Sequence, residues 1–163
     1  MIIASSSIPP VPADAFDGWP EAARLRAAGD AVWANDPEPS PRLTRAAAIT
    51  GAPANVWRPQ ARAEYLSRLR TVRFSADWAL ALRAGVLPPA RPENSQARLA
   101  SLGTPILLLH GRQDMTFPVT LAEDAATEMA NARAVILDQA GHMAHIDDPR
   151  GWLTAVTSFL AEG

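Results

Sequence analysis

The stretch Pro105-Ile106-Leu107-Leu108-Leu109-His110-Gly111-Arg112-Gln113-Asp114 decides the fold class of this 163-residue chain. Its four consecutive aliphatic residues, 106–109, are typical of a strand that is buried on both faces, as in parallel sheets. A second apolar run covers residues 134–137, and Pro118 predicts a helix over residues 118–130 between the two runs. Strand, helix and strand in this order predict two parallel strands joined by a helical crossover.

Two further segments extend this pattern at the ends of the chain. Met1-Ile2-Ile3-Ala4 predicts one more short strand, and Asp148-Pro149 predicts the start of a final helix. That helix would place five apolar side chains on one stripe, namely Trp152, Leu153, Val156, Phe159 and Leu160. The sequence therefore predicts an α/β fold with three parallel strands and flanking helices.

The region between the predicted strands at residues 1–4 and 106–109 differs in composition, because 12 of the 15 prolines lie before residue 93. Proline breaks up long helices, and the segments between the breaks predict short helices over residues 21–28, 41–49, 59–69 and 75–83. Four of the five tryptophans also fall in this region, at Trp19, Trp33, Trp57 and Trp78. We expect a small helical layer with an aromatic underside.

The composition is that of an ordinary globular protein, with 48% hydrophobic residues, 20% charged residues and a net charge of −2. The absence of cysteine rules out disulfides and thiolate chemistry and fits a reducing cytoplasm. Residues 1–99 hold 12 Arg against 9 acidic residues, and residues 100–163 hold 3 against 8, so neither half predicts nucleic-acid binding. No apolar run approaches the ~20 residues that span a bilayer, and no signal peptide is evident. We expect a cytoplasmic protein without a membrane partner.

Polar loops follow the two buried strands, at the edge where ligands of parallel sheets gather. One loop contains Asp114, and the other contains Ala140-Gly141-His142, whose histidine lies 28 residues after Asp114. Adjacent parallel strands would bring the carboxylate and the imidazole to the same rim. A carboxylate that holds one ring N–H leaves the other ring nitrogen free to take a proton from a nucleophile. Asp114 and His142 are therefore the candidate catalytic residues.

On these residues the chain resembles the C-terminal portion of the α/β-hydrolase superfamily. Residues 104–118 are similar to that family's penultimate strand and acid loop, and residues 140–149 are similar to its histidine loop and the start of its last helix. The resemblance implies that residues 1–10 hold a core strand, that residues 11–102 form an inserted helical cap, and that residues 103–163 form the C-terminal part of the core. It also implies that the aromatic cap covers the rim around His142 and encloses an apolar pocket.

The nucleophile of that family is missing from this sequence. In the family it lies in a Gly-x-Ser-x-Gly elbow, yet no Ser or Asp here has Gly two residues before it. Ser5, Ser6 and Ser7 are nearest by position, but Pro9-Pro10 bars the helix that follows an elbow. The oxyanion loop, which precedes the elbow, is missing as well. Residues 108–111 could instead begin an oxyanion loop, but we reject this alternative because only 53 residues follow His110 and none forms an elbow.

Other polar residues near the two loops have structural explanations. His145 is expected to be structural, and His110, at a strand end, to bond to backbone. Asp138 is the only rival to Asp114 as the acid, but it is too close in sequence to His142 to face it easily. Asp147 and Asp148 are expected to place negative charge at the N-terminus of the last helix, where the helix dipole favours it.

These observations predict an α/β-hydrolase-type enzyme that acts on an ester, an amide or a related carbonyl compound, present here as a C-terminal portion without its nucleophile. The resemblance implies a small apolar substrate, no cofactor and no metal. The unpaired edge of the first strand predicts self-association. The alternative function is that of a non-catalytic remnant that binds a small apolar ligand or a partner chain.

Overall fold

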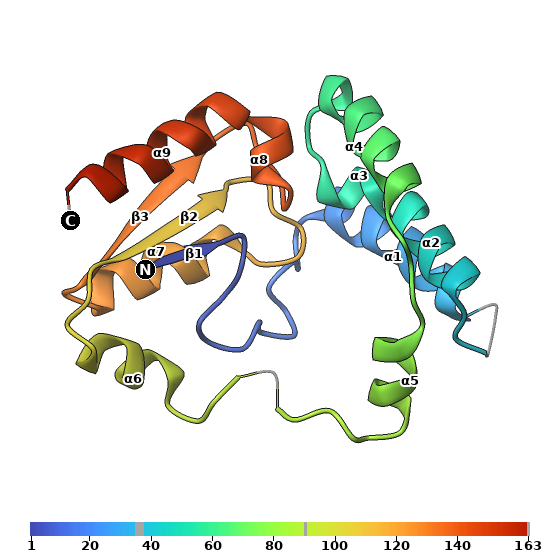
Figure 1. Ribbon diagram of the computed structural model, residues 1–163, viewed down its shortest axis with the longest axis horizontal. Coiled ribbons are helices and arrows are strands. Elements are labelled where there is room, and N and C mark those ends of the chain that lie inside the picture. Colours follow the sequence, from blue (N-terminus) through green and yellow to red (C-terminus); the bar gives the residue numbers. More distant parts are fainter. Residues whose placement is uncertain (35–37, 90, 163) are drawn as a thin grey trace.

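The core of the molecule is a sheet of parallel strands. The computed structural model describes residues 1–34, 38–89 and 91–162. Strands β1 (Ile2–Ala4), β2 (Ile106–Gly111) and β3 (Ala132–Leu137) lie side by side in the order β1-β2-β3, and both neighbouring pairs are parallel (Figure 1). The predicted α/β fold with three parallel strands is therefore confirmed.

Every residue of β2 is buried, because helices cover both faces of the sheet. Side chains alternate along a strand, so Ile106 and Leu108 face α7 (Val119–Glu128), whereas Leu107 and Leu109 face α9 (Pro149–Ala161). Figure 1 shows these two helices on opposite sides of the sheet. Burial on both faces explains why the central strand has no polar residue before His110.

The other helices lie mostly between β1 and β2 in the sequence. They are α1 (Pro20–Ala34), α2 (Pro41–Thr50), α3 (Ala52–Asn55), α4 (Pro59–Thr71), α5 (Asp77–Arg83), α6 (Ser95–Ser101) and, after β3, α8 (Ala144–Asp147). Helices α1 to α4 gather beside the carboxyl ends of the strands (Figure 1). A small core of Ala52, Val56, Tyr65 and Leu69 includes Ile146 of α8. Helices α1 to α5 (residues 20–34 and 38–83), which we call the helical layer, therefore pack directly on the segment that follows β3.

Some expectations about this helical region are wrong. Helix α1 does not end at residue 28 but continues through Gly29, because one glycine costs a helix only about 1 kcal/mol and here lies closely against Gly51. The expected aromatic underside is incomplete, since Trp78 is 66% exposed and Trp33 is 36% exposed.

The apolar stripe predicted for the last helix is wider than the face that α9 buries. Phe159 is buried and Trp152 and Val156 pack beside it, but Leu153 and Leu160 point outward and are exposed. A helix on one face of a sheet buries only a narrow strip of its surface, and these two leucines lie at the margins of that strip. Within the described residues, no helix is both long and apolar enough to cross a membrane.

Candidate active site

Asp114 lies in the loop that follows β2, residues 112–118, which we call the acid loop. Its side chain is fully buried. The carboxylate oxygen Oδ1 accepts hydrogen bonds from the backbone N–H groups of Thr116 at 2.7 Å and Phe117 at 2.9 Å. The acid loop thus folds around its own carboxylate, and the second oxygen, Oδ2, is left for side-chain partners.

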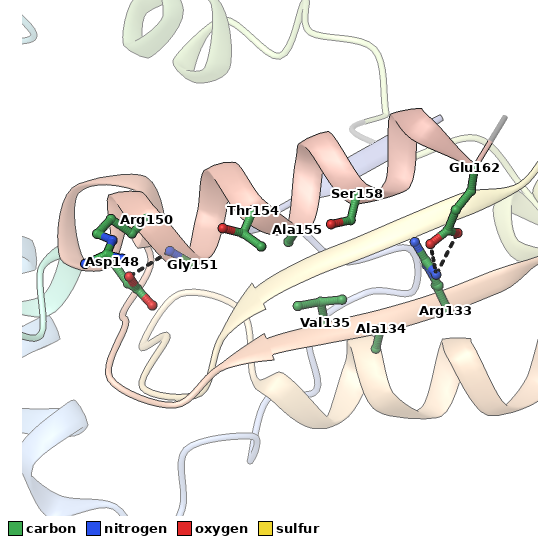
Figure 2. Close-up of a pocket in the computed structure, with 10 residues that line it drawn as sticks. All are labelled: Arg133, Ala134, Val135, Asp148, Arg150, Gly151, Thr154, Ala155, Ser158 and Glu162. Carbon is green, nitrogen blue, oxygen red and sulfur yellow. Dashed lines mark hydrogen bonds and ion pairs between the residues drawn. The ribbon is translucent and has the colours of Figure 1, made fainter.

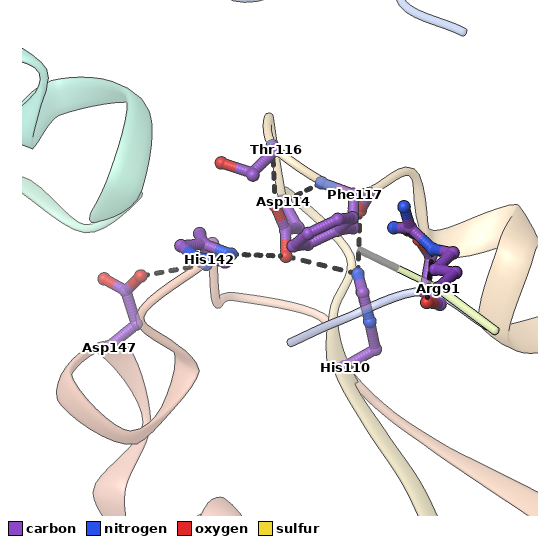
Figure 3. A network of polar contacts seen from close by, with 9 residues as sticks. Arg91, His110, Asp114, Thr116, Phe117, His142 and Asp147 are labelled. Carbon is purple, nitrogen blue, oxygen red and sulfur yellow. Dashed lines mark hydrogen bonds and ion pairs between the residues drawn. The ribbon is translucent and has the colours of Figure 1, made fainter. Parts of the chain in front are cut away.

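His142 lies in the loop that follows β3, residues 138–143, which we call the histidine loop. Its Nδ1 is 3.1 Å from Oδ2 of Asp114 (Figure 3). An ionised carboxylate can only accept a hydrogen bond, so Nδ1 carries the hydrogen and Nε2 has a free lone pair when the ring is neutral. The His142 side chain is 19% exposed, whereas that of Asp114 is not exposed at all. The structure therefore brings the two predicted residues together, with the imidazole on the accessible side.

The surroundings of Asp114 favour its charged form. Burial disfavours that form, but the contacts from His110 and His142 and the N–H of Phe117 outweigh burial and hold the pKa of Asp114 well below its usual range. The carboxylate is therefore ionised over the whole physiological pH range. A permanently ionised acid beside His142 can stabilise an imidazolium when the ring takes up a proton.

Gly111, the last residue of β2, allows the two loops to meet. A Cβ atom at this position would overlap the carbonyl oxygens of Ala140 and Gly141 in the histidine loop. These are backbone atoms, which cannot move aside as the end of a flexible side chain can. Glycine is therefore required here by close approach of the backbone, a role that the sequence pattern did not reveal.

Asp147 connects the histidine loop to the helical layer, which corrects the expectation that it only charges a helix terminus. Its side chain is buried, and Oδ2 accepts from the N–H groups of Gly141 at 2.8 Å and Trp57 at 2.9 Å. Oδ1 accepts from the N–H of Arg58 at 2.8 Å. The neighbouring Asp148 does cap α9, through Gly151 N–H at 2.9 Å. Asp147 was missed because its partners Trp57 and Arg58 are about ninety positions away in the sequence.

The remaining sequence candidates lie apart from the acid and histidine pair. Asp138 forms an exposed ion pair with Arg112 at 2.6 Å and does not face His142. His145 is exposed and packs edge-on against Trp152, and desolvation together with nearby Arg68 lowers its pKa. Ser5 follows β1 with a left-handed backbone, at φ 47°, and its N–H bonds to Leu109.

His110 is expected to bond to backbone, and it does, at 2.8 Å from the carbonyl of Phe117. Its Nε2 also lies 3.2 Å from Oδ2 of Asp114, a contact that the sequence analysis missed. The spacing of four residues across a strand end was the only available indication. Within the described part of the chain, no group of three or more side chains is arranged to hold a metal ion.

A cavity borders Gln139 of the histidine loop, and neither Asp114 nor His142 is among the residues that line it. It measures about 720 Å³ and is lined by Glu21, Leu25, Pro53, Trp57, Arg58, Pro59, Gln60, Arg62 and Gln139. Of the four tryptophans in the first part of the chain, only Trp57 contributes to its wall. Trp33 and Trp78 line a separate groove on the helical layer. The helical layer therefore presents charged and amide side chains beside Gln139 of the histidine loop.

A second hollow lies along the outer side of β3, between that strand and α9. It measures about 850 Å³, and an ion pair between Arg133 and Glu162, at 2.8 Å, crosses one end of it (Figure 2). Neither Asp114 nor His142 is among the ten residues that line it. This groove is therefore separate from the candidate active site.

Comparisons with known proteins agree with the architecture. A family model of α/β hydrolases, described as TAP-like protein, matches residues 71–163. A putative carbamate hydrolase RutD of Pseudomonas savastanoi pv. phaseolicola is 37% identical over 65 residues, which are 40% of this chain and 25% of that protein. The corresponding protein of Pseudomonas syringae pv. syringae is 35% identical over a stretch of the same length and coverage.

Solved structures of hydrolases resemble nearly the whole chain in fold. A thermophilic esterase from Thermogutta terrifontis superimposes with a TM-score of 0.65 and 21% identity, covering 99% of this chain and 55% of the esterase. A hydrolase from Pseudomonas aeruginosa gives a TM-score of 0.61 and 24% identity, covering 98% of this chain and 54% of that protein. The chain thus spans about half the length of these structures and a quarter of the curated relatives.

Proposed function

The chain belongs to the TAP-like family of α/β hydrolases, and from this premise we propose that it supplies the acid and the histidine of a hydrolase active site. Its substrate in this proposal is an ester, an amide or a related carbonyl compound. Carbamates fall within this class, and the curated relatives are described as putative carbamate hydrolases. The single observation that carries the proposal is the 3.1 Å contact between His142 Nδ1 and the buried carboxylate of Asp114.

The chemistry follows from the two ends of the imidazole. Asp114 holds Nδ1–H, which leaves Nε2 free to accept the proton of an attacking hydroxyl group. The imidazolium that forms is stabilised by the ionised carboxylate, and Nε2 then donates the proton to the leaving group. The partial exposure of His142 is what this step requires, because the reacting groups must reach Nε2.

In this proposal the nucleophile and the oxyanion hole come from residues outside this 163-residue chain. No Ser or Asp in the sequence has the glycine that an elbow needs two residues before it. The solved hydrolases also contain a large part that this chain does not cover. Loss of a single oxyanion-hole donor lowers the rate by a factor of about 10²–10³, so an active enzyme needs the oxyanion hole as well as the nucleophile.

The proposal is tested by joining the chain to the part of the Thermogutta terrifontis esterase that it does not cover. We expect the folded chimera to hydrolyse p-nitrophenyl esters, and the 163-residue chain alone to remain at the buffer rate. The variant His142→Ala should abolish the turnover of the chimera, whereas the matched control His145→Ala should preserve it. A folded, active chimera that is indifferent to His142→Ala would refute the proposal, as would turnover by the chain alone that depends on His142.

A second candidate function is binding of a small apolar molecule, favoured by one groove on the helical layer. It measures about 470 Å³ and is lined by Trp33, Pro39, Trp78, Ala79, Leu82 and Arg83. Indole rings this exposed can stack on an apolar ligand. Binding of an apolar fluorescent dye that is lost in Trp78→Ala but kept in Trp152→Ala would support this candidate, and equal binding by both variants would contradict it.

A further inference from the structure

His110 is a buried titratable residue that the proposed chemistry does not use. It lies near the end of β2, and its side chain is only 2% exposed. Nε2 is 2.8 Å from the carbonyl oxygen of Phe117 and 3.2 Å from Oδ2 of Asp114. Both of these oxygens can only accept hydrogen bonds, so Nε2 carries a hydrogen that the two acceptors share.

We infer that His110 is a positioning residue that orients the carboxylate of Asp114 toward His142. Figure 3 shows Asp114 between the two imidazoles, and both contacts are made by the same oxygen, Oδ2. The inference rests on the proposed function, because an acid needs to be positioned only if the pair reacts. His110 itself does not touch the reacting groups, since its Nε2–H is already bound and its ring is inaccessible.

The contacts of Asp114 show what His110 adds. Oδ1 is held by the N–H groups of Thr116 and Phe117, which places this oxygen but leaves the carboxylate free to pivot about it. The N–H of His110 binds Oδ2 and removes that freedom, whether or not His142 is in place. The carboxylate is thereby oriented independently of the position of His142, which is the arrangement that a preorganised site requires.

A second path leads from His110 to His142 through Phe117. His110 Nε2–H binds the carbonyl of Phe117, while the N–H of the same residue binds Asp114. The Phe117 ring packs against the imidazole of His142, with centroids 5.6 Å apart and an interplanar angle of 47°. His110 therefore anchors both groups that touch His142 in this loop, the carboxylate and the phenyl ring.

The test uses the 163-residue chain and needs no enzymatic activity. Nitrogen-15 NMR of the imidazoles reports which ring nitrogen of His142 carries the hydrogen, and amide exchange reports the Phe117 N–H bond. His110→Leu fills the site without a donor, whereas His110→Gln places an N–H near the position of Nε2. We expect His110→Leu to give a mixture of His142 tautomers. It should also accelerate Phe117 amide exchange about tenfold, because the acid loop loses the hydrogen bond from His110 to the carbonyl of Phe117 and opens more often. His110→Gln should restore the wild-type spectrum.

Circular dichroism establishes that each variant is folded. If His110→Leu does not fold, His110→Asn replaces it, because its amide is too short to reach Asp114 and differs from His110→Gln by one methylene. A folded variant without the donor that keeps a single His142 tautomer and wild-type exchange at Phe117 would overturn the inference. Failure of the esterase chimera would refute the proposed function and leave this spectroscopic result standing, so the two failures are distinguishable.

Discussion

The hydrogen bonds of Asp147 that link the helical layer to the histidine loop can be tested quantitatively with Asp147→Ala. The substitution removes the acceptor of three backbone N–H groups, those of Gly141, Trp57 and Arg58. A buried donor left without a partner, such as the N–H of Gly141, costs about 1–3 kcal/mol. The N–H groups of Trp57 and Arg58 are only partly buried and cost less, and removing a buried charge from the fold returns part of the sum. We expect the free energy of unfolding to fall by about 3–5 kcal/mol, which is a large fraction of the ~5–15 kcal/mol of a typical domain.

The matched control is Asp148→Ala, one residue along the chain. Asp148 caps α9 through a single hydrogen bond to Gly151, so its loss should cost about 0.5–2 kcal/mol. Both variants are measured by urea denaturation, followed by circular dichroism and tryptophan fluorescence. If Asp147→Ala is too unstable to study, Asp147→Asn retains the shape of the side chain and should still destabilise more than Asp148→Asn. Equal losses at the two positions would refute the assigned role of Asp147.

Three further predictions concern the loops and the sheet edge. Gly111→Ala should destabilise the fold by about 2–4 kcal/mol, because the added Cβ meets backbone atoms. Its control, Gly29→Ala in α1, should be neutral or stabilising by about 0.5–1 kcal/mol. Equal melting temperatures for the two variants would contradict this prediction. The pKa of Asp114 is lower in the folded state than the unfolded value of about 3.9, so its stabilisation is present above about pH 4 and is lost below it. The stability difference between the wild type and Asp114→Asn should therefore shrink on acidification below pH 4, and a difference that stays constant down to pH 2 would oppose this sign. Among the described residues, β1 (Ile2–Ala4) pairs with a strand on one edge only. Its other edge should cause concentration-dependent self-association, measured by size-exclusion chromatography. A monodisperse monomer at all concentrations would disprove this prediction.

The parallel strands and the positions of Asp114 and His142 could be predicted because short stretches of sequence specify them. The apolar run 106–109 reads directly as a strand buried on both faces, and the loops that follow parallel strands meet at one edge. The acid and the histidine could therefore be placed from two short motifs. The predicted α/β class and the family resemblance are both confirmed.

The parts that failed depend on contacts between distant segments. Asp147 and Asp148 are chemically identical neighbours, and only the packing of the helical layer against the histidine loop decides which of them is buried. The exposure of Trp78 likewise depends on where α5 lies relative to the other helices. No periodicity within a single segment carries that information.

The central claim is that Asp114 holds His142 with Nε2 free, and the tautomer of His142 tests it most directly. Nitrogen-15 NMR at alkaline pH should show the hydrogen of the neutral His142 ring on Nδ1 in the wild type, because the ionised carboxylate can only accept. In Asp114→Asn the amide can donate to Nδ1, and the hydrogen should move to Nε2. A wild-type ring with its hydrogen on Nε2, or a tautomer that Asp114→Asn leaves unchanged, would contradict the account.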